Sequence, residues 1–371
     1  MRIGIEAQRI FRKKKHGMDV YALELIRALQ KLQTPHEWVV FVKPDEDVCL
    51  HSAPGWEIRE VPGKTYVDWE QVALPKAVVE ANVDLLHMTS NTAPLQCPVP
   101  FIVTVHDIMY LTSFTGGSWY QTLGHYYRKW VVPRVITRAQ RILTVSEFER
   151  QKMVKQWPTL PVPIHTVYNG ISPGFTFPGD KITHQSIRDQ YGLPEQYLFF
   201  LGNEAPKKNM LRVLAAYQRY RQQAAQPLPL VIAELSVAQL LPYLAKIEGL
   251  GLLGHIVTPG YITHQHLPFF YQMAHVFIYP SLQESFGIPL IEAMACGAPV
   301  LASNVTALPE VAGSAAVLVD PLDIEALASG LVQLTEDQGR AEVFQKAGLE
   351  RAQAFSWDQT ARQTVQHYES I

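Results

Sequence analysis

Two glutamates eight positions apart flank the start of an expected helix. Glu284 lies in a polar loop after the apolar run AHVFIYP, and Glu292 lies in the second turn of a helix that stops at Gly297. Free backbone N–H groups over 286–290 and the helix dipole favour a phosphate there, and Gly287 lets a ligand approach the backbone. Beside a diphosphate, the two carboxylates would accept hydrogen bonds from a sugar and a ribose. On spacing alone, the alternative is two ordinary surface glutamates.

A pair of lysines follows another expected strand. The segment FLGNEAPKKNML from Phe200 indicates a strand that ends near Gly202, then a polar loop, then a helix that opens after Lys207 and Lys208. Two cations at a strand end, in a chain of net charge −2, indicate a local anion site. The alternative is a pair of exposed lysines in a first helical turn, where the helix dipole disfavours them.

A histidine and an aspartate follow the apolar run FIVTV. Residues at the carboxyl end of a central strand face the ligand in a doubly wound sheet, so His106 and Asp107 are candidates for contact with a ligand. The alternative is a simple turn in which Asp107 accepts hydrogen bonds from backbone N–H groups.

Basic residues gather in two further places. Arg9, Arg12 and residues 13–15 form a cationic loop before Gly17, which opens a helix. The segment 125–141 carries five cations among aromatic residues, a composition that suits an anionic lipid surface. The alternative is an ordinary amphipathic helix whose cations lie in water.

Parallel sheets are the elements that would position these residues. Short apolar runs alternate with segments of helical period in two series, before and after the Pro- and Gly-rich stretch 169–180. We therefore expect an α/β fold of two doubly wound Rossmann-like domains with a cleft between them. Helices are expected over 20–33, 70–80 and 121–139. The expected strands begin at Ile3, Trp38, Val83, Phe101, Arg141, Ile164, Tyr197, Pro229, His255, Ala274, Pro299 and Ala315.

Composition limits the class of protein. A hydrophobic fraction of 47% with 18% charged residues is typical of a soluble globular chain, and 371 residues exceed what a single core usually holds. The net charge of −2 argues against nucleic acid as a partner. Three scattered cysteines make neither a disulfide framework nor a zinc pattern. Without a signal peptide or an apolar run of about 20 residues, a cytoplasmic location is expected.

The residues around the two glutamates resemble a known signature. The stretch ESFGIPLIE, followed by AMACGAPVLAS and LPEVAGSAAVLVDPLD, is similar to the donor site of the retaining family 4 glycosyltransferases, which have the GT-B fold. The resemblance implies that the chain moves a hexose from a nucleotide-diphosphate sugar to a glycan or lipid-linked acceptor in surface polysaccharide synthesis. It implies neither a cofactor nor a metal. The segments PKKN and HDI favour GDP-mannose as the donor.

The resemblance also implies roles for individual residues. Glu284, His106 and Lys208 would be the catalytic residues. Members of the family usually carry an arginine where this chain has Asn203, and Lys207 would replace it. The acceptor would be bordered by Arg12, Gly17, His106 and Asp107. Contact with the donor is expected for Gly202, Asn203, Lys207, Lys208, Tyr261, Ile262, Glu284, Ser285, Phe286, Gly287, Ile288, Pro289, Leu290 and Glu292.

The resemblance further divides the chain into functional parts. We expect an acceptor-binding domain over 1–172, a nucleotide-sugar-binding domain over 173–355, and a terminal helix over 356–371 that packs back on the first domain. The expected partners are the donor and the acceptor, with an anionic surface on the inner face of a membrane as an open alternative. Two rival functions stay open, a GT-B epimerase or hydrolase and a catalytically silent sugar-nucleotide binding subunit, the latter because of Asn203.

Overall fold

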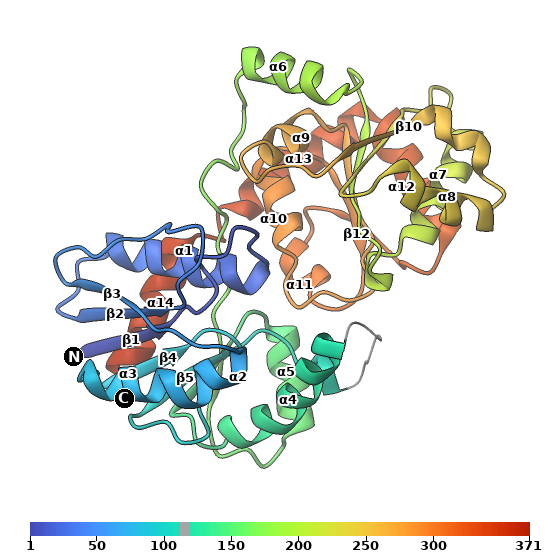
Figure 1. Ribbon diagram of the computed structural model, residues 1–371. Coiled ribbons are helices and arrows are strands. Elements are labelled where there is room, and N and C mark those ends of the chain that lie inside the picture. Colours follow the sequence, from blue (N-terminus) through green and yellow to red (C-terminus); the bar gives the residue numbers. More distant parts are fainter. Residues whose placement is uncertain (112–118) are drawn as a thin grey trace. The chain divides into compact units, whose positions relative to one another are not determined.

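The chain folds into two compact units. The structure is a computed structural model that describes residues 1–111 and 119–371 (Figure 1). Unit 1 comprises Met1–Gly170 together with Trp357–Ile371, and unit 2 comprises Ile171–Ser356. The cleft expected between the two halves stays a prediction.

Unit 1 contains a seven-stranded parallel sheet with the order β3-β2-β1-β4-β5-β6-β7. The order reverses between β1 and β4, where Ile5 pairs with His87. Doubly wound sheets bind ligands beyond the carboxyl ends of the strands at this switch point. The alternating strand β3 was missed in the sequence because it lacks the continuous apolar run of a buried parallel strand. The strands are β1 (Arg2–Glu6), β2 (Glu37–Val42), β3 (Trp56–Glu60), β4 (Leu85–Met88), β5 (Phe101–Val105), β6 (Arg141–Thr144) and β7 (Ile164–Thr166).

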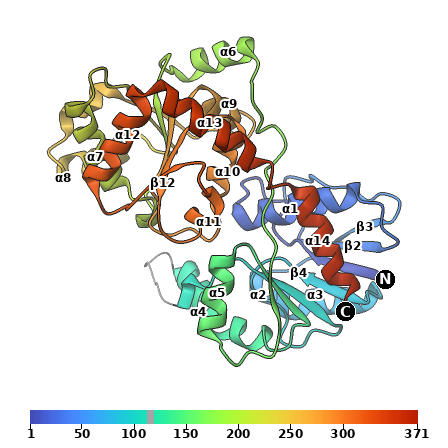
Figure 2. The ribbon, with the colours of Figure 1, turned by 180° about the vertical axis from the view of Figure 1, so that it is seen from behind.

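Helices cover the sheet of unit 1. The terminal helix α14 packs beside α1, although the two are far apart in the sequence (Figures 1 and 2). The helix expected over 70–80 is one part of a longer helical stretch that includes a π-helical segment, η1, and the helix expected over 121–139 ends early, at Val135. The helices are α1 (Gly17–Lys31), α2 (Tyr66–Asp68), η1 (Trp69–Ala73), α3 (Leu74–Glu80), η2 (Met109–Leu111), α4 (Trp119–Val135), α5 (Glu147–Gln156) and α14 (Trp357–Glu369).

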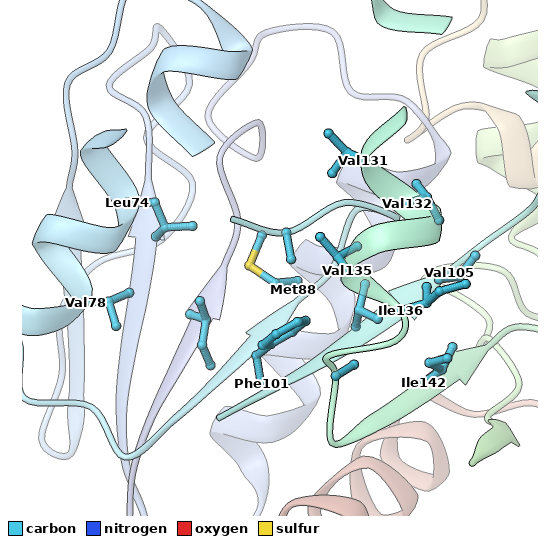
Figure 3. Packing of buried hydrophobic residues seen from close by; sticks show 14 of the residues in the cluster. Leu74, Val78, Met88, Phe101, Val105, Val131, Val132, Val135, Ile136 and Ile142 are labelled. Atoms are coloured by element: carbon cyan, nitrogen blue, oxygen red, sulfur yellow. The ribbon is translucent and has the colours of Figure 1, made fainter. Parts of the chain in front are cut away.

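One apolar cluster fixes α3 and α4 on the sheet of unit 1. Figure 3 shows Val78 of α3 and Val135 of α4 among the buried side chains around Met88 and Phe101. Burying side chains of this kind stabilises the fold by about 1.5 to 3 kcal/mol each. This packing holds the polar residues of η1 and α4 next to the carboxyl end of the sheet.

Unit 2 repeats the design with a six-stranded parallel sheet of order β10-β9-β8-β11-β12-β13. Here the order reverses between β8 and β11, where Phe200 pairs with Ile278. All six strands expected in this half are present, and together the two units confirm the expected α/β class. The strands are β8 (Leu198–Leu201), β9 (Leu230–Ala233), β10 (Ile256–Gly260), β11 (Val276–Tyr279), β12 (Val300–Ser303) and β13 (Val317–Val319).

The helices of unit 2 connect these strands and cover the sheet (Figure 2). Within the described residues of the whole chain, no helix has the length and apolarity to cross a membrane. The helices are α6 (Lys181–Tyr191), η3 (Pro206–Lys208), α7 (Met210–Gln223), α8 (Val237–Lys246), η4 (Leu250–His255), α9 (Leu267–Met273), α10 (Ile288–Ala295), α11 (Leu308–Ala312), α12 (Ile324–Glu336) and α13 (Gln338–Ala352).

Candidate functional site

A cluster of charged side chains lies at the switch point of unit 2. The loop after β8 carries the two lysines, and the loop after the neighbouring strand β11 carries the glutamate. The Nζ of Lys208 lies 2.8 Å from Oε1 of Glu284, and the Nζ of Lys207 lies 3.5 Å from Oε2. The topology thus brings together three residues that the sequence analysis took from segments far apart in the chain.

Tyr279 completes this cluster and was missed in the sequence. Its hydroxyl lies 3.4 Å from Nζ of Lys208, and its ring centre lies 4.8 Å from the same ammonium group. The available signal was its place as the last residue of β11, immediately before Pro280. We name Lys207, Lys208, Tyr279 and Glu284 the donor-edge cluster.

Glu284 is ionised in this environment. The residue is only 9% exposed, and burial alone would raise its pKa. The charges of Lys208 and Lys207 and the hydrogen bonds from Lys208 and Tyr279 outweigh that effect and lower the pKa below its ordinary value. The carboxylate therefore remains an acceptor of hydrogen bonds at neutral pH.

Asn209 ties the two loops of the cluster together. It adopts a left-handed conformation with a φ of 63°, and its Nδ2 donates to the carbonyl of Pro280 at 3.1 Å and to that of Pro321 at 2.7 Å. The backbone N–H of Leu282 donates to the carbonyl of Lys207 at 2.8 Å. These bonds fix the positions of both lysines relative to the loop that carries the glutamate.

The backbone at the start of α10 offers fewer donors than the sequence analysis expected. Of the N–H groups expected to be free over 286–290, Pro289 has none, because proline lacks this group, and Leu290 donates to the carbonyl of Gly287 at 2.9 Å. The N–H groups of Gly287 and Ile288 have no acceptor among the described residues. Gly287 has a φ of 103°, which side-chain-bearing residues rarely adopt, and a Cβ there would lie 2.6 Å from Cδ2 of Leu308, so a substitution is strained.

Glu292 lies inside α10 with its carboxyl group almost fully buried. The residue is 5% exposed, and no described residue hydrogen-bonds its side chain. Burial alone raises its pKa to about 8. A buried carboxyl group without a partner is costly, and the raised pKa of Glu292 reflects that cost.

The remaining residues expected at the donor are unevenly placed. Gly202 is buried directly after β8, while Asn203 is exposed and its Oδ1 accepts a hydrogen bond from the N–H of Ala205 at 3.0 Å. Asn203 therefore shapes the loop. After β10, Tyr261 is 59% exposed whereas Ile262 is buried. Only the tyrosine of these two presents a large surface to solvent.

In unit 1, His106 follows β5 as a buried neutral imidazole. Its Nε2 lies 2.8 Å from the carbonyl of Thr89, which can only accept, so Nε2 carries the proton and Nδ1 is left with a lone pair. Burial lowers the pKa of His106, against the effect of that hydrogen bond. The edge of the Tyr21 ring packs on the imidazole at 4.6 Å between centroids. His106 can accept a hydrogen bond through Nδ1.

The other residues expected at the acceptor lie around the same edge of the sheet or in the loop after β1. Asp107 accepts a hydrogen bond from the N–H of Met109 at 3.0 Å, the local turn that the sequence analysis weighed as its alternative. Arg12 and Gly17 are exposed, and a Cβ on Gly17 would meet nothing within 4 Å. Within residues 1–111 and 119–371, no group of three or more His, Cys, Asp or Glu side chains is placed to hold a metal ion.

Comparisons with known proteins find a matching family for each half of the chain. The family described as Glycosyltransferase Family 4 matches residues 16–175, and the family described as Glycosyl transferases group 1 matches residues 184–351. O-antigen chain mannosyltransferase B of Escherichia coli is 31% identical over 271 residues, which cover 73% of this chain and 70% of that protein.

Two further proteins match this chain to different extents. Serotype-specific mannosyltransferase WbdA of Escherichia coli is 28% identical over 236 residues, 62% of this chain, and the match spans only 29% of WbdA. The structure of sucrose-phosphate synthase from Thermosynechococcus elongatus superposes with a TM-score of 0.77 at 19% identity, over 100% of this chain and 98% of that one. The latter is a likeness of fold.

Proposed function

The chain belongs to glycosyltransferase family 4, and we propose that it moves a hexose from a nucleotide-diphosphate sugar to a glycan or lipid-linked acceptor in surface polysaccharide synthesis. Mannose, carried by GDP-mannose, is the favoured sugar, because two relatives are named mannosyltransferases. The GT-B fold expected from the sequence agrees with the likeness of fold to sucrose-phosphate synthase.

The donor-edge cluster is the observation that supports this function. It holds two ammonium groups and one carboxylate, so its net charge is positive at the place where doubly wound sheets bind ligands. The ammonium group of Lys208 has three N–H donors, of which Glu284 and Tyr279 occupy two. The third is available for a diphosphate oxygen, as are the free N–H groups of Gly287 and Ile288.

The cluster suits the departure of a nucleoside diphosphate. The bond between C1 of the sugar and the phosphate oxygen breaks, and negative charge develops on the diphosphate, where Lys208 and Lys207 stabilise it. The acceptor hydroxyl forms a new bond to C1 on the same face, and its proton passes to the leaving phosphate, which gives retention without a metal. Glu284 orients the sugar hydroxyls. It is a poor nucleophile because its oxygens already accept from Lys207 and Lys208.

Other residues bind the nucleoside of the donor, the transferred sugar and the acceptor. Glu292 binds the ribose hydroxyls and gains the hydrogen bonds that it lacks in the free chain, while the backbone around Tyr261 and Ile262 contacts the base. The lone pair on Nδ1 of His106 accepts a hydrogen bond from a sugar hydroxyl, and Arg12, Gly17 and Asp107 border the acceptor.

Turnover with and without an acceptor tests this function. The purified chain is incubated with GDP-mannose, UDP-glucose or a TDP-sugar, alone or with a lipid-diphosphate glycan, and nucleoside diphosphate release is followed. We expect release that depends on the acceptor, with the anomeric configuration of the donor retained in the product. Release without acceptor indicates a hydrolase, interconversion of the donor an epimerase, and binding without turnover a silent subunit.

The outward side of α4 supports a peripheral place on the inner face of the cytoplasmic membrane. Leu123, Tyr126 and Trp130 share one face of the helix, and Trp130 is 50% exposed with the guanidinium of Arg134 4.4 Å from its ring centre. Aromatic rings with nearby cations suit the interface of an anionic bilayer.

Liposome flotation tests this membrane contact. We expect binding to vesicles that contain anionic phosphatidylglycerol and several-fold weaker binding of the Tyr126→Ala/Trp130→Ala variant, because the apolar contact is lost. Val79→Ala, at an exposed position on α3, is the matched control and should float like the native chain. Equal, negligible binding to neutral and anionic vesicles would end the membrane proposal.

A further inference from the structure

A separate cavity of about 340 Å³ opens on the same edge of the unit 1 sheet as His106. Its walls come from the loop after β1, the first turn of α1, α2, the residue Ser90 beyond β4, and α4. The carboxyl ends of β1 and β4 form the switch point of this sheet, so the cavity occupies the position where a doubly wound domain takes its ligand.

Three guanidinium groups line the cavity, and two of them are uncompensated. Arg9 pairs with Asp19 through a contact of 2.9 Å. Arg12 and Arg128 form no ion pair or side-chain hydrogen bond with any described residue, and the Nε of Arg128 is buried without an acceptor. None of the described residues that line the cavity is acidic. Arg12 is exposed to solvent, whereas Arg128 is held partly out of water. A guanidinium held partly out of water without a counter-charge is unfavourable, and an anionic ligand would relieve that cost at Arg128.

The tyrosines of the cavity cannot serve that anion, because a buried carboxylate occupies their hydroxyls. Glu70, at the start of the π-helical segment η1, accepts hydrogen bonds from Tyr66 at 2.8 Å, from Tyr127 at 2.5 Å and from Gln71 at 2.9 Å, as well as one from Thr92. The two tyrosine rings meet edge to face with their centroids 5.9 Å apart. Their positions are therefore fixed, and what they present to the cavity is apolar ring surface.

The cavity thus has two chemically different parts. Arg12 and Arg128 supply positive charge, whereas the rings of Tyr66 and Tyr127, with Leu123 and neighbouring aliphatic side chains, supply an apolar wall. A sugar ring packs its C–H face on aromatic rings and can carry a phosphate within reach of arginine, which binds phosphate oxygens in pairs. A neutral sugar would leave the guanidinium of Arg128 without a counter-charge.

From this we infer that the acceptor is anionic, a glycosyl phosphate or diphosphate whose phosphate is bound by Arg12 and Arg128 and whose sugar packs on Tyr66 and Tyr127. The inference rests on the proposed function, since it assigns the substrate class of the acceptor. Glu70 is a positioning residue here, because it acts on the ligand only through the two tyrosines.

Direct binding tests the charge requirement without any transfer step. The full chain, with its donor site saturated by GDP, is titrated calorimetrically with octyl mannosyl phosphate, with uncharged octyl mannoside and with mannose 1-phosphate. We expect the charged octyl ligand to bind at least about tenfold more tightly than the neutral one. Binding of mannose 1-phosphate with equal affinity identifies a water-soluble sugar phosphate as the source, and weaker binding identifies a lipid-linked one.

Substitution of the two arginines locates the preference. In the Arg12→Gln/Arg128→Gln variant, we expect the two octyl ligands to bind within about threefold of each other. Arg362→Gln, at an exposed position on α14 without a side-chain partner among the described residues, should keep the full preference. The unfolding midpoint of the Arg128→Gln variant should equal or exceed that of the native chain, because an uncompensated cation is removed.

Two results would overturn the inference: equal or absent binding of the charged and neutral octyl ligands, and a preference that survives replacement of both arginines. The failure of the proposed function looks different. A chain that prefers the charged ligand but turns over no sugar nucleotide with any acceptor keeps the anion site and loses the transferase activity. A chain that transfers readily to neutral acceptors and shows no charge preference loses only the inference.

Discussion

The two units place polar residues at the same point of similar sheets but leave different groups uncompensated. In unit 2 the lysines are paired with Glu284, and the carboxyl group of Glu292 has no hydrogen-bond partner among the described residues. In unit 1 the buried carboxyl group of Glu70 accepts four hydrogen bonds, and the Nε of Arg128 is buried without an acceptor.

This difference separates residues that hold the fold together from residues that await a ligand. A buried charge that is fully hydrogen-bonded, like that of Glu70, belongs to the scaffold, and its removal costs stability. A buried polar group without a partner is unfavourable in the free chain and gains from binding. We therefore expect hydroxyl-bearing ligands to bind at Glu292 in unit 2 and anionic ligands to bind at Arg128 in unit 1.

The largest expected effect on stability comes from Glu70→Ala. This change removes the carboxyl group to which Tyr66, Tyr127 and Thr92 donate, which should lower the free energy of unfolding by about 3 kcal/mol. Urea unfolding measures the loss. Glu80→Ala, at an exposed position on α3, is the control and should change stability by less than about 0.5 kcal/mol. A loss below about 1 kcal/mol in Glu70→Ala would remove the contrast between the two carboxyl groups.

Glu292→Gln is expected to raise the free energy of unfolding, and the size of this increase depends on pH. The pKa of Glu292 is about 8 in the folded chain against an ordinary 4.5, so both states are protonated below pH 4.5 and the group then contributes nothing. Between these values the unfolded chain gives up the proton first, and the native protein loses about 1.4 kcal/mol per pH unit relative to the variant.

Urea unfolding at pH 5 and pH 8.5 checks this. We expect the Glu292→Gln variant to match the native chain within about 1 kcal/mol at pH 5 and to exceed its stability by at least about 2 kcal/mol at pH 8.5. Glu350→Gln, at an exposed position on α13, should show no such trend. A pH-independent difference would mean that Glu292 is compensated in the free chain.

The smallest expected effect is the loss of kcat/KM on replacement of Lys207, and it distinguishes this lysine from Lys208. Lys207 has a side chain that is 40% exposed and a contact of 3.5 Å with Glu284, against 12% and 2.8 Å for Lys208. Because solvent screens the more exposed charge, Lys207→Ala should lower kcat/KM by about tenfold or less. If Lys207→Ala and Lys208→Ala lower it equally, the assumed asymmetry within the donor-edge cluster is wrong.

The fold and the ends of the strands could be predicted from the sequence, but the side-chain contacts between these elements could not. Apolar runs predicted twelve of the thirteen strands in the described residues, because a buried parallel strand is a continuous run of apolar residues. Family resemblance joined Lys208 and Glu284, which lie far apart in the chain. Tyr279 was missed because the sequence does not distinguish a tyrosine at the end of an apolar strand from a core residue. Only the contacts of its hydroxyl group in the structure do so.

The polar interior of unit 1 could not be read from the sequence at all. Glu70 lies in a stretch of helical period, where a glutamate normally faces solvent, and its donors come from α2, η1, α4 and the loop after β4. Only tertiary packing brings these together. The helix start at Gly287 is a different case, since the absence of an N–H on Pro289 is evident from the sequence and the expectation of free donors over 286–290 was wrong there.

The central claim is that the donor-edge cluster stabilises charge on a departing diphosphate, and steady-state transfer by Lys208→Ala tests it most directly. We expect kcat/KM to fall at least about 100-fold while the protein stays folded, because a charge-stabilising contact is lost from the transition state. Lys246→Ala, at an exposed position on α8, should keep native turnover. A folded Lys208→Ala protein whose kcat/KM lies within threefold of the native value would contradict the account.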